Sequence, residues 1–137
     1  MSEIPVITLA GNLIVSIQVD LTDESLERLK EAVGDEIERR APGGLVIDVS
    51  GLAVMDSYIT RGLCDLAGIA RLMGVRTLLC GLRPQVAITL VEMGIELEGI
   101  QTALSLDAAL LRLHDLRMAE EDSDDVDHDL ETVEARG

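Results

Sequence analysis

The chain has 137 residues and a net charge of −15, and this length suffices for one domain with a buried core. Its acidity and its single aromatic residue, Tyr58, argue against nucleic-acid binding, because such a surface repels phosphate backbones and offers bases no stacking platform. No apolar run approaches the roughly 18 to 20 residues that span a membrane, and the first residues show no signal-peptide pattern.

The N-terminal part of the chain predicts a β-hairpin followed by a helix. Ile4–Ala10 and Leu13–Ile17 are rich in β-forming residues, and Gly11-Asn12 between them suits a tight turn. Thr22 or Asp23 caps the helix, and a Pro-Gly-Gly segment ends it. Its apolar positions recur at steps of three and four: Leu26, Leu29, Val33 and Ile37.

Two buried strands and a long helix are predicted in the middle of the chain. Leu45–Val49 is apolar apart from Asp48, as expected for a parallel strand covered on both faces, and Val75–Cys80 has a similar pattern. The helix between them spans Ser57–Met73 and ends at Gly74. Its apolar face consists of Ile59, Leu63, Leu66, Ala70 and Met73.

The last predicted elements complete an α/β fold. A third helix begins at Pro84 and ends at Gly94, and a short extended segment covers Glu98–Thr102. Ser105 caps a final helix that turns Leu106, Ala109, Leu110 and Leu113 inward. This order predicts about four helices on a mixed β-sheet, which has the N-terminal hairpin at one edge and parallel strands inside.

Acidic residues concentrate at the C-terminus. Ala119–Gly137 holds nine acidic residues and one basic residue, a net charge of −8, whereas residues 1–118 have a net charge of −7. Such a segment cannot bury enough apolar area to fold. We therefore predict one domain over residues 1–118 and a disordered acidic tail over residues 119–137, which solvates the protein.

The residues predict no enzyme, cofactor or metal site. His114 and His128 have no partner nucleophile, and Gly43-Gly44 precedes a strand, whereas a phosphate-binding glycine loop follows one. Cys64 and Cys80 lie in apolar segments without metal-type spacing. We interpret both as buried free thiols of a reducing compartment, which predicts a cytoplasmic protein.

Asp48 ends a strand, where a receiver domain carries its phosphorylated aspartate. A receiver also needs acidic residues after its first strand to hold Mg²⁺ and a lysine at a later strand end. Here the first strand ends in Ala10-Gly11-Asn12, and the only lysine, Lys30, lies in the first helix. Asp48 is therefore predicted to be a structural carboxylate that accepts hydrogen bonds from loop N–H groups.

Asp56-Ser57 opens the second helix and allows two interpretations. Either residue could simply cap the helix, since both types are preferred there. Alternatively, Ser57 is a phosphorylation site, because free N–H groups and the helix dipole favour negative charge at a helix start.

The segment Leu45–Ser57, with the sequence LVIDVSGLAVMDS, resembles the core of a STAS domain, the fold of anti-sigma-factor antagonists. Arg71–Arg76, Gly81–Pro84 and Ala87–Ile95 extend the resemblance. These blocks are most similar to the stressosome branch of the family, and particularly to its short single-domain antagonists. The resemblance runs from about Ile4 to Leu116.

The resemblance implies a non-enzymatic phosphorylation switch. It assigns Ser57 as the phosphoacceptor, with Asp56, Asp48 and Tyr58 as its neighbourhood. Thr89 takes the place of a second phosphoacceptor found in sensor-type paralogues. A threonine inside a helix, however, often bonds to the backbone carbonyl four residues earlier instead.

The resemblance also implies partners. They are a serine/threonine switch kinase, sensor-bearing STAS paralogues in a large assembly, a phosphatase, and further copies of this chain in a homo-oligomer. Under stress the kinase would phosphorylate the antagonist and leave the assembly to activate a downstream partner. Since no sensor domain precedes the STAS segment, stress sensing is expected in a paralogue.

The residues after Ser57 bear on two other functions. Simple antagonists usually have small residues there, including glycine, whereas this chain has Tyr58-Ile59-Thr60-Arg61. That difference favours the stressosome type over the alternative, a stand-alone antagonist that binds an anti-sigma kinase directly. A third possibility, a STAS module that regulates a membrane transporter in trans, has no feature in this sequence that tests it.

Overall fold

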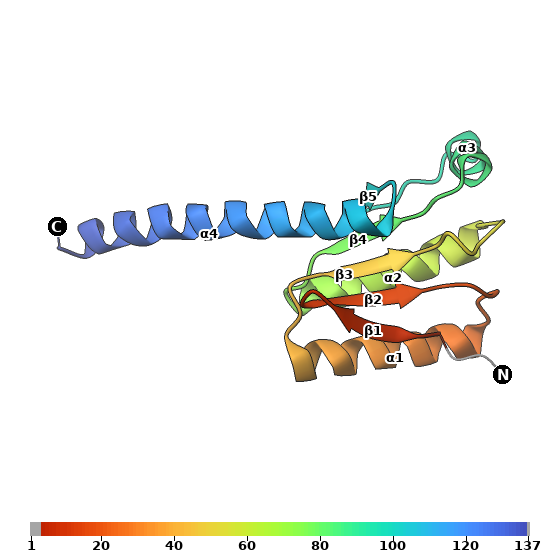
Figure 1. Cartoon of the computed structure of the whole chain (residues 1–137), viewed down its shortest axis with the longest axis horizontal. Coiled ribbons are helices and arrows are strands. Elements are labelled where there is room, and N and C mark those ends of the chain that lie inside the picture. The colour runs from red at the N-terminus through yellow and green to blue at the C-terminus, as the bar shows by residue number, and fades with distance from the viewer. Residues whose placement is uncertain (1–3, 137) are drawn as a thin grey trace.

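The computed structural model describes the backbone of residues 4–136 and the side chains of residues 4–122. A five-stranded sheet with the strand order β1-β2-β3-β4-β5 forms its centre (Figure 1). β1 pairs with β2 in antiparallel fashion, and all other pairs are parallel. The predicted mixed sheet with a hairpin edge is confirmed. The strands are β1 (Val6–Leu9), β2 (Asn12–Ser16), β3 (Leu45–Asp48), β4 (Thr77–Cys80) and β5 (Gln101–Ala103).

The hairpin turn lies one residue earlier than predicted. Leu9 pairs with Asn12, so the two turn residues are Ala10 and Gly11, with φ angles of 52° and 78°. A two-residue turn with positive φ at both positions matches the twist of the flanking strands. Asn12 is instead a buried strand residue whose amide donates to the Ala10 carbonyl at 3.2 Å. This register keeps Leu13 in the core.

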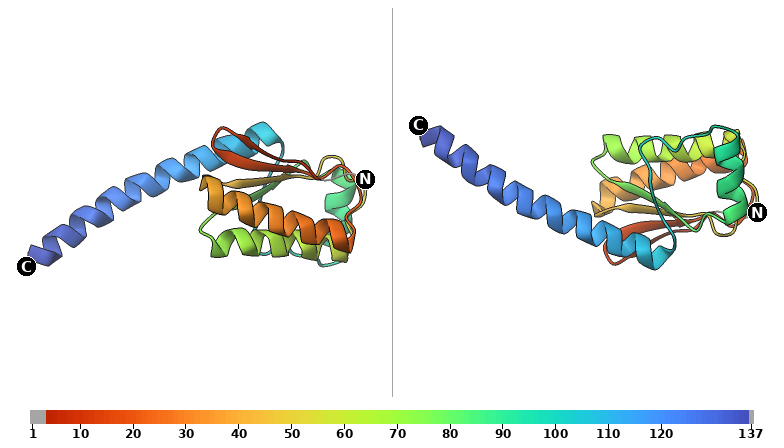
Figure 2. Two further views of the ribbon diagram at one scale, coloured as in Figure 1. Left: turned by 90° about the horizontal axis from the view of Figure 1, so that it is seen from below. Right: turned by 90° about the horizontal axis from the view of Figure 1, so that it is seen from above.

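Helices cover both faces of the sheet (Figure 2). α1 (Asp23–Arg40) and α2 (Ser57–Leu72) lie on one face, and the start of α4 (Leu106–Arg136) lies on the other. Alternate residues of β2 show the division, because Leu13 and Val15 pack toward α1 and α2 whereas Ile14 packs toward α4. The shorter α3 (Pro84–Glu92) sits beyond the ends of the strands.

Most predicted helix faces are confirmed. Thr22 is the N-cap of α1 and accepts a hydrogen bond from the Ser25 N–H at 3.1 Å. Met73 is an exception, since α2 ends at Leu72 and Met73 is its half-exposed C-cap. There the chain leaves the helix through Gly74, whose φ is +83°. The confirmed buried positions of α1 and α2 are Leu26, Leu29, Val33, Ile37, Ile59, Leu63, Leu66 and Ala70.

The last helix is longer than the predicted domain. The Ser105 hydroxyl accepts a hydrogen bond from the Ala108 N–H at 3.2 Å, as expected of a cap, and Ala109 and Leu113 are buried. α4 then continues past the sheet (Figure 1) through the segment predicted as a disordered tail. Residues 118–121 are good helix formers, and an ion pair between Glu120 and Arg76 stabilises the helix at this point. The domain boundary after Met118 stays a prediction.

Within the described residues, no helix is both long and apolar enough to cross a membrane.

Replacement of Gly51 tests how the loop after β3 packs. A Cβ atom at Gly51 would lie 2.8 Å from the Gln18 Cα and 3.0 Å from the Ile17 carbonyl oxygen, both backbone atoms. Gly51→Ala should therefore lower the free energy of unfolding by about 1–3 kcal/mol. Gly68→Ala in α2, where a Cβ meets nothing within 4 Å, should raise it by about 0.5–1 kcal/mol. Urea denaturation measures both free energies of unfolding. If Gly51→Ala left the free energy of unfolding unchanged, the close packing of this loop would be contradicted.

Candidate functional site

The predicted site residues gather at one end of the sheet. Parallel strands β2, β3 and β4 all end there, and the loop after β3 leads from Asp48 to the start of α2 (Figure 1). α3 follows β4 at the same end. In a sheet of parallel strands, the loops at the carboxyl ends are the usual place for functional groups.

Asp48 helps hold the loop between β3 and α2. Its carboxylate is half-buried and accepts a hydrogen bond from the Ser50 N–H at 2.9 Å. The Arg83 guanidinium donates to the Ser50 carbonyl at 3.1 Å from the other side. The loop after β4 passes so close that a Cβ on Gly81 would lie 2.8 Å from the Asp48 carboxylate. The geometry is that of a structural carboxylate with one loop N–H donor, and the role of Asp48 in a switch stays a prediction.

Asp48 also affects the thiol at the end of β4. Cys80 is buried, and burial, together with the nearby charge of Asp48, raises the pKa of its thiol to about 11.

Cys64 was predicted to be buried too, but it is only half-buried. It lies at the side of the apolar face of α2, between buried Leu63 and exposed Asp65. At neutral pH both thiols stay protonated, because burial raises the pKa of Cys64 as well.

The two residues at the start of α2 have different roles in the structure. Asp56 is the N-cap, and its carboxylate accepts a hydrogen bond from the Ile59 N–H at 2.8 Å. Its carbonyl accepts a second bond from the buried Thr60 hydroxyl at 2.8 Å. Ser57 is the first helical residue, and its side chain is exposed. Among the described residues, no side-chain hydrogen bond involves the Ser57 hydroxyl, so Asp56 caps the helix while this hydroxyl faces solvent.

Tyr58 connects the starts of α1 and α2. Its hydroxyl donates a hydrogen bond to the Asp23 carboxylate in the first turn of α1. That bond, followed by partial desolvation and then by the charges of Asp23, Glu27 and Asp56, raises the pKa of the Tyr58 phenol above its ordinary value of 10.0. The surface beside Ser57 is therefore already rich in negative charge.

Thr89 lies on α3, at the same end of the molecule but on a different element. Its hydroxyl donates to the Gln85 carbonyl at 2.9 Å, which is the backbone bond expected for a threonine inside a helix. The side chain is exposed and lines a small cavity of about 110 Å³ between α3 and the loop residues Ala53–Met55. Modification of Thr89 stays a prediction.

Exposed apolar side chains accompany these residues, and sequence reasoning missed them. Val54 in the loop and Ile88 and Val91 on α3 are all more than half exposed. We call these three residues the α3 patch. The spacing of Ile88 and Val91 could have indicated an outward face, since the inward residues Val86 and Leu90 occupy the other side of the helix.

His, Cys, Asp and Glu are the side chains that most often hold metal ions in proteins. Within residues 4–122, no three His, Cys, Asp or Glu side chains lie where they could hold a metal ion. His114 is exposed on α4. His128 lies beyond the residues whose side chains are described.

Residues 3–109 match the STAS domain family. The chain belongs to this family. The structure is similar to a Ser→Glu variant of RsbS from Moorella thermoacetica, with 39% sequence identity, a TM-score of 0.73, and coverage of 85% of this chain and 99% of that one. A chain from a structure of the stressosome, described as a signal integration and transduction hub, is 41% identical, with a TM-score of 0.72 and coverage of 82% and 98%.

Two of the curated relatives are larger proteins that contain a similar segment. The RsbT co-antagonist protein RsbRA of Bacillus subtilis is 30% identical over 113 residues, which are 74% of this chain and 41% of that protein. RsbRB of the same organism, also an RsbT co-antagonist, is 32% identical over 107 residues, which are 77% of this chain and 39% of that protein. The chain thus spans about two fifths of the length of these two relatives.

Removal of the Asp56 carboxylate tests the division between Asp56 and Ser57. Asp56→Ala loses the N-cap bond to Ile59 and should lower the free energy of unfolding by about 0.5–2 kcal/mol. Asp56→Asn keeps an acceptor and should lose less. Ser57→Ala is the neighbouring control and should stay within about 0.5 kcal/mol of the parent. Equal losses at both positions, measured by denaturation, would show that Ser57 contributes to the cap.

Titration of Tyr58 tests the acidic environment at the start of α2. Tyr58 is the only aromatic residue, so the ultraviolet absorbance of phenolate reports this side chain alone. We expect a pKa above the ordinary 10.0, and Asp23→Asn should lower it because the carboxylate acceptor and its charge are removed. Glu24→Gln, at an exposed neighbour in α1, should change it less. A pKa unmoved by Asp23→Asn would contradict the contact.

Proposed function

We propose that this protein is a non-enzymatic phospho-switch scaffold of a stressosome-type assembly in the cytoplasm. In the unmodified state it holds a serine/threonine switch kinase together with sensor-bearing STAS paralogues and further copies of itself. The kinase phosphorylates Ser57 and is then released to act on a downstream partner in a stress response. A phosphatase restores the starting state.

The observation that carries the proposal is the exposed hydroxyl of Ser57 beside the Asp56 cap. A kinase needs an accessible hydroxyl without a competing role in the fold, and Ser57 meets that need. The family comparison supports the assignment, because this chain is similar to RsbS over nearly all of the length of the latter. Similarity to two RsbT co-antagonists supports a role among STAS paralogues.

Phosphorylation at this position can alter binding while the fold stays intact. A phosphoserine adds a charge of about −1.5 to −2 at neutral pH and three acceptor oxygens. Free N–H groups and the dipole at the start of α2 favour that charge, and Arg61, one turn further on, can pair with it. The new charge still joins Asp56, Asp23 and Glu27, so the surface becomes more repulsive toward an acidic partner.

The α3 patch supplies a contact surface for such a partner. Val54, Ile88 and Val91 are apolar and exposed at the end of the sheet that carries Ser57. A partner that covers this patch would place its own surface beside the Ser57 hydroxyl, where added charge weakens the contact. Thr89 lies within α3 itself, so its modification would act on this surface as a second, weaker switch.

Variants of Ser57 test the proposal. Incubation with the switch kinase and ATP should phosphorylate the parent protein at Ser57 and leave Ser57→Ala unmodified, as mapped by mass spectrometry of peptides. Ser57→Asp should weaken kinase binding only in part, because it carries about half the charge of phosphoserine. This weakening should shrink as salt rises, since exposed charges are screened over roughly 8 Å at physiological ionic strength.

Ser57→Asn is the matched control, because it is polar and uncharged and should bind the kinase like the parent. If Ser57→Asn weakens binding as much as Ser57→Asp, then shape at the helix start controls release and charge does not. Stoichiometric phosphorylation of Ser57→Ala at the parental rate would overturn the assignment of the site.

A further inference from the structure

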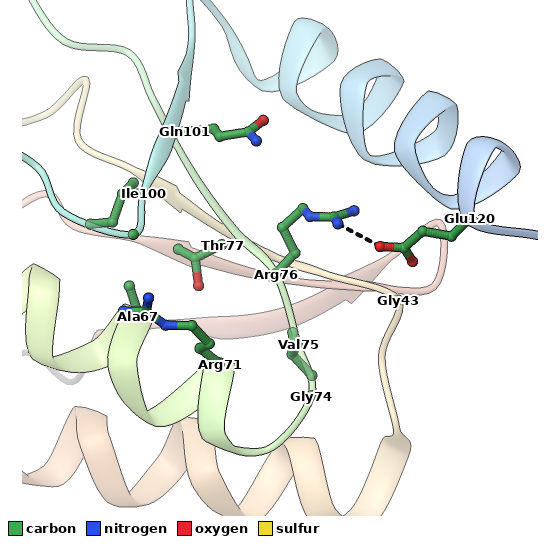
Figure 3. Close-up of a pocket in the computed structure, with 11 residues that line it drawn as sticks. Gly43, Ala67, Arg71, Gly74, Val75, Arg76, Thr77, Ile100, Gln101 and Glu120 are labelled. Carbon is green, nitrogen blue, oxygen red and sulfur yellow. Dashed lines mark hydrogen bonds and ion pairs between the residues drawn. The ribbon is translucent and has the colours of Figure 1, made fainter. Parts of the chain in front are cut away.

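A second cavity lies at the far end of α2 from Ser57. It has a volume of about 530 Å³, is open to solvent, and lies between the last turns of α2, the segments that lead into β4 and β5, and α4 (Figure 3). α2 has 16 residues, so a rise of 1.5 Å per residue places this cavity roughly 20 Å or more from the switch serine. This volume is within the range of pockets that bind small molecules.

The walls of the cavity carry positive charge in a protein whose net charge is −15. Arg71 from the end of α2 and Arg76 from the residue just before β4 both line it. Arg117 of α4 lies just outside and packs against the lining residue Gly43, where a Cβ atom would come within 2.7 Å of the guanidinium. Among the residues whose side chains are described, the acidic residue that lines the cavity is Glu120, which forms an ion pair with Arg76.

Arg71 has no carboxylate partner among the described residues. Its guanidinium nevertheless stays at the cavity wall and packs on Gly99, where a Cβ atom would lie 2.6 Å from Nη2. Although the residue as a whole is exposed, the contact with Gly99 keeps the guanidinium at the cavity wall, where a ligand can reach it. Figure 3 shows that Arg71 approaches the cavity from the α2 side, whereas Arg76 approaches it from β4.

Thr77 supplies an independent observation. It lines the cavity, its residue is only 3% exposed, and its hydroxyl has no hydrogen-bond partner among the described residues. A buried hydroxyl without a partner is costly, so a native structure normally retains one for a reason. In Figure 3 the hydroxyl is directed toward the side of the cavity where the Arg71 guanidinium lies.

We propose that this cavity binds a small molecule that carries a phosphate group. Two guanidinium groups and a hydroxyl reach the cavity from different elements, and all three are donors. A planar carboxylate is satisfied by one bidentate arginine, whereas phosphate accepts hydrogen bonds from several directions and carries more charge. A water molecule could satisfy Thr77 alone, but it would not account for the cationic walls.

Binding would also involve α4. The phosphate would compete with Glu120 for the Arg76 guanidinium, so the ion pair that joins α4 to β4 would be weakened or replaced. Occupancy of the cavity is thereby linked to the position of the acidic C-terminal helix. This inference does not depend on the proposed phosphorylation of Ser57, which lies at the other end of α2.

Calorimetric titration of the full chain with pyrophosphate and with citrate, at constant ionic strength, tests the proposal. We expect millimolar or tighter binding of pyrophosphate and much weaker binding of citrate. Arg71→Gln and Arg76→Gln should each weaken pyrophosphate binding at least about tenfold. Glu120→Gln should strengthen it, because it frees Arg76. Arg39→Gln makes the same charge change on α1, outside the cavity, and should bind like the parent.

Variants of Thr77 separate a role in binding from a role in folding, because the two roles predict different changes in melting temperature and in pyrophosphate binding. Thr77→Val removes the unpartnered hydroxyl, so it should raise the melting temperature of the free protein while weakening pyrophosphate binding. Thr77→Ser restores the hydroxyl and should restore binding. Absence of pyrophosphate binding, citrate binding of equal strength, or equal losses in Arg71→Gln and Arg39→Gln would each overturn the proposal.

Discussion

The parallel pairing of β3 between β2 and β4 is the constraint on which the rest of the structure depends. Hydrogen bonds from the Ile17 N–H to the Asp48 carbonyl and from the Val49 N–H to the Cys80 carbonyl continue this pairing past the ends of the strands. They bring the loops after all three strands to one edge. These bonds fix the position of the loop after β3 relative to the neighbouring strands. The first turn of α2, which follows this loop, is therefore fixed as well.

At that position, the cap and the proposed phosphorylation site are adjacent residues. Asp56 satisfies the N–H group of Ile59, so the Ser57 hydroxyl is not needed by the helix. Had Ser57 itself been the cap, a phosphate would have replaced a hydrogen bond that stabilises α2. The separation explains physically how one helix start can be both stable and open to chemical change. The acidic contacts of Tyr58 then make the surface sensitive to one further negative charge.

The two ends of α2 differ in charge. Its N-terminal end lies among Asp23, Glu27 and Asp56, whereas its C-terminal end contributes Arg71 to a cavity with cationic walls. This distribution matches the helix dipole, which stabilises anions near an N-terminus and cations near a C-terminus. Both ends thus follow the dipole, and both carry exposed polar groups beyond those that the fold requires.

The sequence by itself determined the element order, the helix faces and the candidate switch, because apolar periodicity, caps and glycines are local signals. It also carried the family resemblance through the segment around Asp56-Ser57. Only the tertiary structure decided the turn at Ala10-Gly11, the exposure of Met73 and the choice of Asp56 as cap. The same holds for the cavity, since Arg71, Thr77 and Glu120 meet only when α2, β4 and α4 pack together. Local patterns specify which residues form an element, whereas contacts between distant elements depend on how those elements pack in three dimensions.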